Sequence, residues 1–245
     1  MQNKLRVLYW DVETSPTKFW GWRTGKTYLS HDQIVKGQKL GIICICYKWA
    51  GEKEVYSLDW DVKKQDSSKM IEEFTKVVEV ADIAIGHNSD KFDQRWVNTQ
   101  RLINGQPPVA WPSSEDTLKQ FRKHFFLPSY ALDYISKLLT GSGKDKMIFD
   151  DWIQIVDNKD PKALAKMISY CKKDVLKLEE VYNKAKAFFS PKINASLIVN
   201  GDKSGCPRCG SLKTKSRGLK TLVAGRYRVR RCLVCLHSFR TNEKV

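Results

Sequence analysis

Two acidic residues stand two positions apart at the end of the first apolar segment, Leu5 to Val12, which is typical of a β-strand. Side chains two apart on a strand share a face, so we expect Asp11 and Glu13 to point to the same side of a sheet. Carboxylates held close together repel and are costly to desolvate unless a cation lies between them. The pair therefore predicts a site for a divalent cation. The competing interpretation is a charged turn, since Asp-x-Glu is a common tripeptide at strand ends.

A further acid lies on a long expected helix, which begins at the N-cap Asp160 and runs to about Phe189. On this helix Tyr170 and Asp174 are one turn apart and lie beside apolar positions. A carboxylate on the buried face of a helix is uncommon unless it is paired or binds a metal. The alternative is that Asp174 lies at the edge of the apolar stripe and reaches water or Lys177.

A third group follows the short expected strand Ile83 to Ile85. Asp93 lies in the first turn of an expected helix, Phe92 to Ile103, from where it can face the same strand ends as Asp11. Asn88 is expected to cap that helix. The alternative for Asp93 is that it only complements the helix dipole, as acids in a first turn commonly do.

Taken in order, Asp11-x-Glu13, Asn88-x-x-x-Phe92-Asp93 and Tyr170-x-x-x-Asp174 closely resemble the three motifs of the DnaQ-like, DEDDy family of 3′→5′ exonucleases. The resemblance covers residues 5 to 189. It implies an α/β, ribonuclease H-like fold, with a mixed five-stranded sheet flanked by helices.

The resemblance also implies a chemistry. In such enzymes the acids that correspond to Asp11, Glu13, Asp93 and Asp174 hold two Mg²⁺ or Mn²⁺ ions, which suits hard oxygen ligands and an in-line displacement. Tyr170 would orient the attacking water, and nucleoside 5′-monophosphates would be released. The sister subclass uses a histidine instead, and the sequence has none near Asp174. The Trp-rich stretch after Glu13 and residues 33–52 are similar to stand-alone exonucleases often encoded by phages.

Several residues are candidates for contact with the 3′-terminal nucleotide. Thr14 and Ser15 follow the acid pair and can offer backbone or hydroxyl donors, and Asn88 belongs to the second motif. Trp20 lies in a stretch rich in glycine and charge, where an aromatic ring can stack on a base. The alternative for Trp20 is partial burial under the edge of the sheet.

Four cysteines near the C-terminus form two C-x-x-C pairs, Cys206 with Cys209 and Cys232 with Cys235. Four thiolates at this spacing predict a closed tetrahedral zinc site that is structural and separate from the carboxylates. His237 follows closely, but the four sulfurs already complete the coordination. We therefore expect a zinc ribbon that holds one Zn²⁺.

This C-terminal segment is also strongly basic. The chain carries 43 Lys and Arg against 27 Asp and Glu, a formal net charge of +16. From Lys203 onward twelve basic residues oppose the single acid Glu243, which is typical of a polyanion-binding surface. Arg226, Arg228 and Arg230 alternate with apolar residues, so on a strand they would share a face and contact phosphates. The competing interpretation is that the ribbon docks a replication or repair protein.

The elements that would position these groups follow from the hydrophobic periodicity. Expected strands are Leu5–Val12, Leu40–Trp49, Glu54–Leu58 and Ile83–Ile85, and expected helices are Ser67–Val80, Phe92–Ile103, Glu115–Phe126, Ala131–Leu139 and the long helix from Asp160. A flexible break is expected at residues 141–144. The domain organisation predicted from this order is an exonuclease domain at 1–190, a linker at 191–204 and a basic zinc ribbon at 205–245.

Alternatives to a DNA exonuclease remain at this point. An exoribonuclease is the nearest one, because the motifs do not separate DNA from RNA. A catalytically silent nucleic-acid-binding adaptor has no need of the four acids and Tyr170, and an endonuclease or transposase-like relative would lack the Tyr170-x-x-x-Asp174 pattern. The longest apolar run, Leu40 to Tyr47, is too short for a membrane span, and no signal segment is evident, so we expect a cytoplasmic protein, in the host cytoplasm if phage-encoded.

Overall fold

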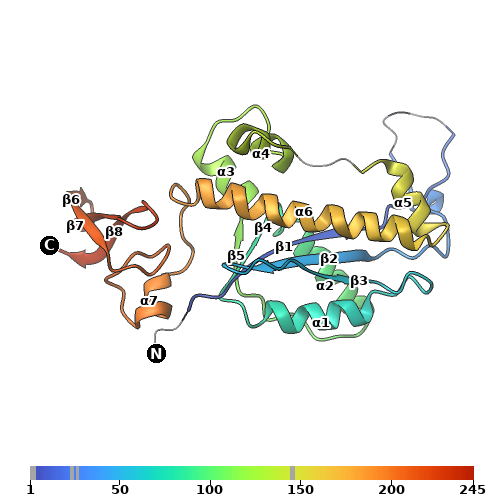
Figure 1. The fold of residues 1–245 in the computed structure, drawn as a ribbon, viewed down its shortest axis with the longest axis horizontal. Coiled ribbons are helices and arrows are strands. Elements are labelled where there is room, and N and C mark those ends of the chain that lie inside the picture. Colours follow the sequence, from blue (N-terminus) through green and yellow to red (C-terminus); the bar gives the residue numbers. More distant parts are fainter. Residues whose placement is uncertain (1–3, 23–24, 26–27, 144–146) are drawn as a thin grey trace.

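A mixed five-stranded sheet lies at the centre of the fold, in the strand order β3-β2-β1-β4-β5 (Figure 1). Its strands are β1 (Val7–Thr14), β2 (Ile42–Trp49), β3 (Tyr56–Asp59), β4 (Ile83–Gly86) and β5 (Ser113–Asp116). The strands β1, β2 and β3 pair antiparallel, whereas β4 is parallel to both β1 and β5. The structure is a computed structural model and describes residues 4–22, 25, 28–143 and 147–245.

Helices cover both faces of this sheet. α1 (Ser68–Val78) and α2 (Asp93–Ile103) lie on one face, and the long helix α6 (Pro161–Ala185) crosses the other (Figure 1). The remaining helices before α6 are η1 (His31–Gln33), α3 (Thr117–His124), α4 (Leu132–Thr140) and α5 (Phe149–Val156). Because β2 is covered on both sides, residues 42–46 are apolar without alternation and fully buried. The expected ribonuclease H-like class, a mixed five-stranded sheet with flanking helices, is confirmed.

The long helix begins as expected but ends earlier. The Asp160 side chain accepts a hydrogen bond from the Lys162 backbone N–H at 2.8 Å, and Pro161 occupies the first turn. The helix ends at Ala185, four residues before the expected Phe189. The reason is that Phe189 turns back into the core, where its ring packs edge-on against Phe121 with 5.2 Å between centroids.

The strand β5 was not expected. Residues 115–126 were predicted to be one helix, but residues 113–116 form a strand, and α3 begins only at Thr117. The four residues of β5 are all polar, so they carry no hydrophobic alternation from which a strand could be inferred. Asp116 caps α3 by accepting a hydrogen bond from the Lys119 N–H at 3.3 Å. The helix α5 was likewise not predicted.

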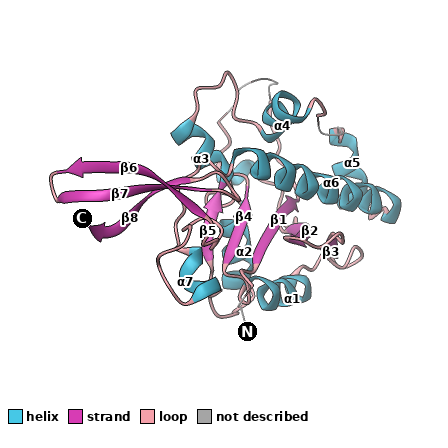
Figure 2. Cartoon of the chain, turned by 60° about the vertical axis from the view of Figure 1, so that its left-hand side comes forward, coloured by secondary structure: helices cyan, strands magenta, loops and turns pink. Residues whose placement is uncertain are grey.

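The C-terminal part forms a separate three-stranded antiparallel sheet of β6 (Thr214–Leu222), β7 (Gly225–Cys232) and β8 (Ser238–Lys244). Figure 2 shows these strands extending away from the remainder of the chain. The segment 191–204, expected as a linker, contains the short helix α7 (Ala195–Asn200), which Asn194 caps. No helix among the described residues is long and apolar enough to span a membrane.

Candidate functional site

Three of the predicted acids meet at one point. Carboxylate oxygens of Asp11, Glu13 and Asp174 lie within 4.8 Å of one another, although the two strand residues and the helix residue are more than 160 positions apart. Asp11 and Glu13 are partly buried on the face of β1 that α6 covers, and Asp174 is only 3% exposed. The alternative in which Asp174 reaches solvent at the edge of the helix is therefore wrong. Three carboxylate oxygens at this spacing match the hard donor set that Mg²⁺ or Mn²⁺ prefers.

Tyr170 adds a hydroxyl group to this cluster. Its phenol donates a hydrogen bond to Asp174, one helical turn away. Burial, followed by the negative charges of Asp174, Glu13 and Asp11, raises the pKa of Tyr170 well above its ordinary value. The phenol therefore keeps its proton at neutral pH and acts as a hydrogen-bond donor beside the carboxylates.

Asp93 is not one of the three acids within 4.8 Å of one another, but it contacts the backbone of β1 between two of them. β4 pairs with β1 only up to Tyr9, so the next part of β1 continues without β4 beside it. Asp93, the first residue of α2, fills that place: its carboxylate accepts a hydrogen bond from the Val12 N–H at 3.2 Å, and its side chain is 2% exposed. Asp93 thus lies in the first turn of α2, as expected, and against the backbone between Asp11 and Glu13.

The two residues after Glu13 differ in what they can offer a substrate. The pairing of β1 with β2 shifts register between Glu13 and Thr14, which turns Thr14 away from the regular alternation. Ser15 is buried, its N–H donates to the Gly41 carbonyl at 2.9 Å, and its hydroxyl accepts from the Gly41 N–H at 2.8 Å. Ser15 therefore closes the loop between β1 and β2, and Thr14 is the better candidate donor at this strand end.

Asn88 does not cap α2 as expected. The residue before α2 is Phe92, and Asn88 lies four residues earlier with a left-handed φ of 67°. Its N–H donates to the Asp116 carboxylate at 3.0 Å, and its carbonyl accepts from Phe92 N–H at 3.0 Å. Asn88 makes the tight turn that joins β4 to α2, since asparagine tolerates the left-handed conformation.

The candidate stacking residue Trp20 lies in an exposed loop. Its side chain is 75% exposed, so the alternative of burial under the sheet edge is wrong. The loop is held by backbone pairing, because the Trp20 N–H donates to the Gln33 carbonyl at 2.8 Å and Phe19 forms an isolated bridge with Ile34. Trp22 is 98% exposed in the same loop.

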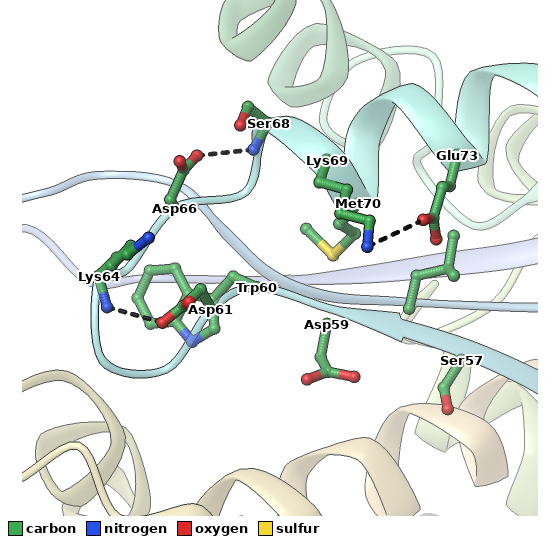
Figure 3. A pocket seen from close by; sticks show the side chains of 11 residues that line it. Ser57, Asp59, Trp60, Asp61, Lys64, Asp66, Ser68, Lys69, Met70 and Glu73 are labelled. Atoms are coloured by element: carbon green, nitrogen blue, oxygen red, sulfur yellow. Dashed lines mark hydrogen bonds and ion pairs between the residues drawn. The ribbon is translucent and has the colours of Figure 1, made fainter.

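A hollow of about 450 Å³ lies elsewhere, at the edge of the sheet between β3 and α1 (Figure 3). Its acids are largely engaged: Asp61 accepts from the Lys64 N–H at 2.8 Å, Asp66 accepts from the Ser68 N–H at 2.9 Å, and Glu73 lies 3.9 Å from Lys69 (Figure 3). None of the predicted site residues lines this hollow.

The four cysteines of the C-terminal part converge as predicted. The sulfurs of Cys206, Cys209, Cys232 and Cys235 lie within 4.8 Å of one another, with 3.6 Å between Cys206 and Cys235 and 3.6 Å between Cys209 and Cys232. Such a tetrad is able to form a zinc ribbon. His237 faces away from it, since its Nδ1 lies 2.9 Å from the Ala187 carbonyl.

The first cysteine knuckle is anchored in the main body by a buried ion pair. Arg208, between Cys206 and Cys209, places its Nη1 2.6 Å from both carboxylate oxygens of Glu115 on β5. The same nitrogen donates to the Tyr182 hydroxyl at 2.9 Å, and Nη2 donates to the Phe189 carbonyl at 2.8 Å. The side chains of Arg208 and Glu115 are 3% and 2% exposed. The ribbon is therefore packed against the main body through this buried pair and is not joined to it by the linker alone.

The basic residues of the ribbon occupy both faces of its sheet. Arg226, Arg228 and Arg230 share one face of β7; the first two are exposed, and Arg230 donates to the Thr214 hydroxyl at 3.0 Å. The strand register places a second set on the opposite face, around Tyr227 and Val229: Lys215, Lys220, Arg231 and Arg240. The guanidinium of Arg240 stacks over the Tyr227 ring at 4.4 Å from its centroid. The sequence alternation revealed only the first set, because the second depends on cross-strand pairing.

A family model described as the RNase_H superfamily matches residues 33–186, which is more than half of the chain. The chain belongs to the RNase H superfamily. The matched range contains Asp93, Tyr170 and Asp174, while β1 with Asp11 and Glu13 precedes it. No curated protein matches the chain.

Among solved structures, this RNase H superfamily member is similar to the family B DNA polymerase from the hyperthermophilic archaeon Pyrobaculum calidifontis, with a TM-score of 0.57 and 14% sequence identity. The match covers 75% of this chain and 25% of the polymerase, so the chain spans about a quarter of that protein. At this identity the similarity concerns the fold. Membership of the RNase H superfamily supports a nuclease, and the carboxylate trio and the cysteine tetrad are each able to hold metal ions.

Proposed function

We propose that the chain is a 3′→5′ exonuclease that uses two divalent cations and removes nucleotides from the 3′ end of DNA. The observation that carries the proposal is the convergence of Asp11 and Glu13 with the buried Asp174 and its partner Tyr170. Three carboxylates within 4.8 Å of one another cost several kcal/mol of repulsion in a partly buried site, and bound cations would remove that cost.

In this proposal Asp11, Glu13 and Asp174 hold the cations, and Asp93 completes the set from the start of α2. The Asp93 carboxylate already accepts from the Val12 N–H, which fixes its position against β1. Bound divalent cations would supply positive charge that makes a water molecule more acidic and stabilises the departing 3′ oxygen.

The phenol of Tyr170 would orient the attacking water. Its proton is committed to Asp174, so its oxygen lone pairs remain able to accept a hydrogen bond from water. Attack on the terminal phosphodiester would break the bond to the 3′ oxygen of the preceding nucleotide and release a nucleoside 5′-monophosphate. Thr14 at the strand end and Trp20 in the exposed loop are the proposed contacts with the terminal nucleotide.

The ribbon would hold the nucleic acid by its phosphates. Both faces of its sheet carry exposed Lys and Arg, and the sheet projects from the body (Figure 2). Such contacts raise affinity without reading sequence. Arg208 docks the first cysteine knuckle against Tyr182, which is eight residues from Asp174 on α6, roughly 12 Å by helix rise.

The test is hydrolysis of 5′-labelled single- and double-stranded DNA and RNA with Mg²⁺ or Mn²⁺. We expect a ladder that shortens from the 3′ end, with DNA degraded faster than RNA. Asp11→Asn or Asp174→Asn should lose about 4 kcal/mol of transition-state stabilisation, roughly a thousand-fold in rate. Glu180→Gln, an exposed acid on the same helix, is the matched control and should retain the wild-type rate.

Two results would contradict this proposal. Cleavage of circular single-stranded DNA would point to an endonuclease, since a circle has no 3′ end. Wild-type rates in the Asp174→Asn variant would remove the acid cluster from the chemistry. Faster degradation of RNA would reassign the substrate to RNA and leave the mechanism standing.

A further inference from the structure

Three cysteines outside the ribbon also meet at one point. Cys44 and Cys46 lie on β2 and Cys171 lies on α6, and their sulfurs are within 4.8 Å of one another. All three are fully buried. The chain has seven cysteines, and each belongs either to this thiol triad or to the ribbon tetrad.

A buried cysteine often serves as a small apolar core side chain, but packing alone does not require three of them to meet. Cys171 is 125 residues from Cys46 in the sequence, so the fold itself brings the thiols together. The triad satisfies the same spacing as the ribbon tetrad. Sulfur ligands lie about 2.3 Å from a bound zinc ion, so sulfurs a few ångströms apart can share one ion after small side-chain adjustments.

We propose that Cys44, Cys46 and Cys171 form a second thiolate metal site, which binds a thiophilic divalent cation such as Zn²⁺ or Cd²⁺ between β2 and α6. Soft sulfur ligands select such ions over Mg²⁺, so this site is chemically distinct from the neighbouring carboxylates. The proposal does not depend on hydrolysis by the chain.

The surroundings of the triad favour a cation. Across the sheet, Cys44 pairs with Glu13 on β1 and with Asp59 on β3, so a carboxylate stands on each side of it. Asp59, which is outside the carboxylate trio, would provide an oxygen as the fourth ligand that tetrahedral zinc requires, after side-chain adjustment. The thiols hydrogen-bond to one another, and two of them also contact backbone carbonyls: Cys46 that of Ile168 at 3.7 Å and Cys171 that of Asp11 at 3.6 Å.

The hollow at the sheet edge is lined by two strand neighbours of the triad. Ser57 and Asp59 line this hollow and lie on the same side of β3 (Figure 3). These two residues are also the cross-strand neighbours of Cys46 and Cys44. Asp59 is therefore an acid at the edge of the sheet, one strand away from the buried thiols.

A metal ion bound by the thiol triad would affect the positions of the neighbouring acids. Cys171 follows Tyr170 directly and precedes Asp174 by one turn of α6, and its partners on β2 pair with Asp11 and Glu13. A metal bound by the triad would cross-link α6 to β2 beside the carboxylate trio. It would thereby fix the distance between this helix and this strand.

The test uses Cd²⁺ as the probe and the full chain. Excess Mg²⁺ is present to occupy the carboxylates, and the ultraviolet sulfur-to-cadmium charge-transfer band is measured at saturation. We expect two Cd²⁺ ions retained per chain after desalting and a band corresponding to all seven thiolates. In Cys171→Ala the count should fall to one ion and the band to about four sevenths, the share of the ribbon cysteines.

Val175→Ala is the matched control, because it removes a similar volume from the buried face of α6 without removing a sulfur. It should retain the full band. A wild-type chain that binds one Cd²⁺ with a four-thiolate band overturns the proposal without reference to any variant. A disulfide between Cys171 and either β2 cysteine in the protein isolated without reductant, with no second ion bound after reduction, also overturns it.

Discussion

The carboxylate of Asp174 is a charged group at 3% exposure, and it shares its surroundings with two more acids. Two unit charges 4 Å apart interact by about 4 kcal/mol at the effective dielectric constant of a protein near its surface. Repulsion of this size, repeated over three pairs, is tolerated only where something opposes it. The Tyr170 hydrogen bond opposes part of it, and bound cations would oppose the rest.

The substitution Tyr170→Phe separates the contribution of the tyrosine hydroxyl from that of the bound cations. We expect the variant to bind Mn²⁺ as wild type does, because the carboxylates are intact, while turnover falls roughly a hundred-fold or more through loss of the group that orients water. Turnover in single-turnover assays and Mn²⁺ affinity by calorimetry are the measurements. Tyr134→Phe, a tyrosine on α4, is the control that keeps both values. Unchanged turnover in Tyr170→Phe would mean that the phenol has no part in hydrolysis.

Single residues also show which parts of the site could be predicted from the sequence. Asp11, Glu13 and Asp174 were candidates from strand and helix periodicity, and the order of the three motifs, which resembles that of the exonuclease family, selected them. The role of Asn88 could not be chosen in the same way, since it depends on the Asp116 carboxylate 28 residues later. Ser15 likewise resembles a substrate contact until its hydrogen bonds with Gly41 are known.

At the scale of elements, β5 and the first cysteine knuckle depend on each other. Glu115 is buried in an all-polar strand, and its charge is matched by Arg208, 93 residues later. Sequence patterns reveal apolar periodicity and metal-ligand spacing, but they carry no signal for an ion pair between distant segments. The docking of the ribbon was missed for this reason, and β5 because its four residues are all polar.

Removal of one partner of this pair should be costly. Arg208→Met leaves the Glu115 carboxylate buried without its counter-charge, so we expect the free energy of unfolding to fall by about 3–5 kcal/mol. The measurement is urea unfolding at a fixed zinc concentration. The double variant Arg208→Met/Glu115→Leu should recover much of the loss, because it removes both charges.

Lys213→Met is the control for this series. Lys213 is an exposed residue of the same ribbon, and its substitution should change stability by less than about 0.5 kcal/mol. If the Arg208→Met variant is as stable as this control, the ion pair does not hold the ribbon in place.

At the scale of the whole molecule, charge is concentrated at one end. Residues 203–245 hold +11 of the +16 net charge, and Figure 1 places their sheet at the opposite end of the long axis from α5. The fold class of residues 5–189 was predicted from the resemblance of the three motifs, and periodicity located the longer helices, while the four-residue strand β5 was missed. The distribution of the ribbon charges over two faces was not, because antiparallel register decides it.

Neutralising each face separately tests how the ribbon contacts nucleic acid. Arg226→Gln/Arg228→Gln and Lys220→Gln/Arg240→Gln each remove two exposed charges, from opposite faces of the same sheet. For duplex DNA, each lost phosphate contact should lower the slope of log affinity against log salt by about 0.9. Fluorescence anisotropy over a salt series measures this slope.

Point substitutions suit this question better than deletion of residues 200–245, since deletion also removes Arg208 from its buried partner Glu115. An unchanged slope in both double variants would assign the ribbon to a protein partner. A change in one variant alone would identify the face that contacts phosphate.

The position of Arg208 late in the chain also determines when its contact with Glu115 can form during synthesis. A polypeptide emerges from the ribosome from its N-terminus, so β5 and α6 are available to fold before the knuckle that carries Arg208 has been made. Until then the Glu115 carboxylate and the Tyr182 hydroxyl lack the guanidinium group that contacts both of them. The Glu115–Arg208 contact is therefore among the last to form, after every strand of the central sheet has been synthesised.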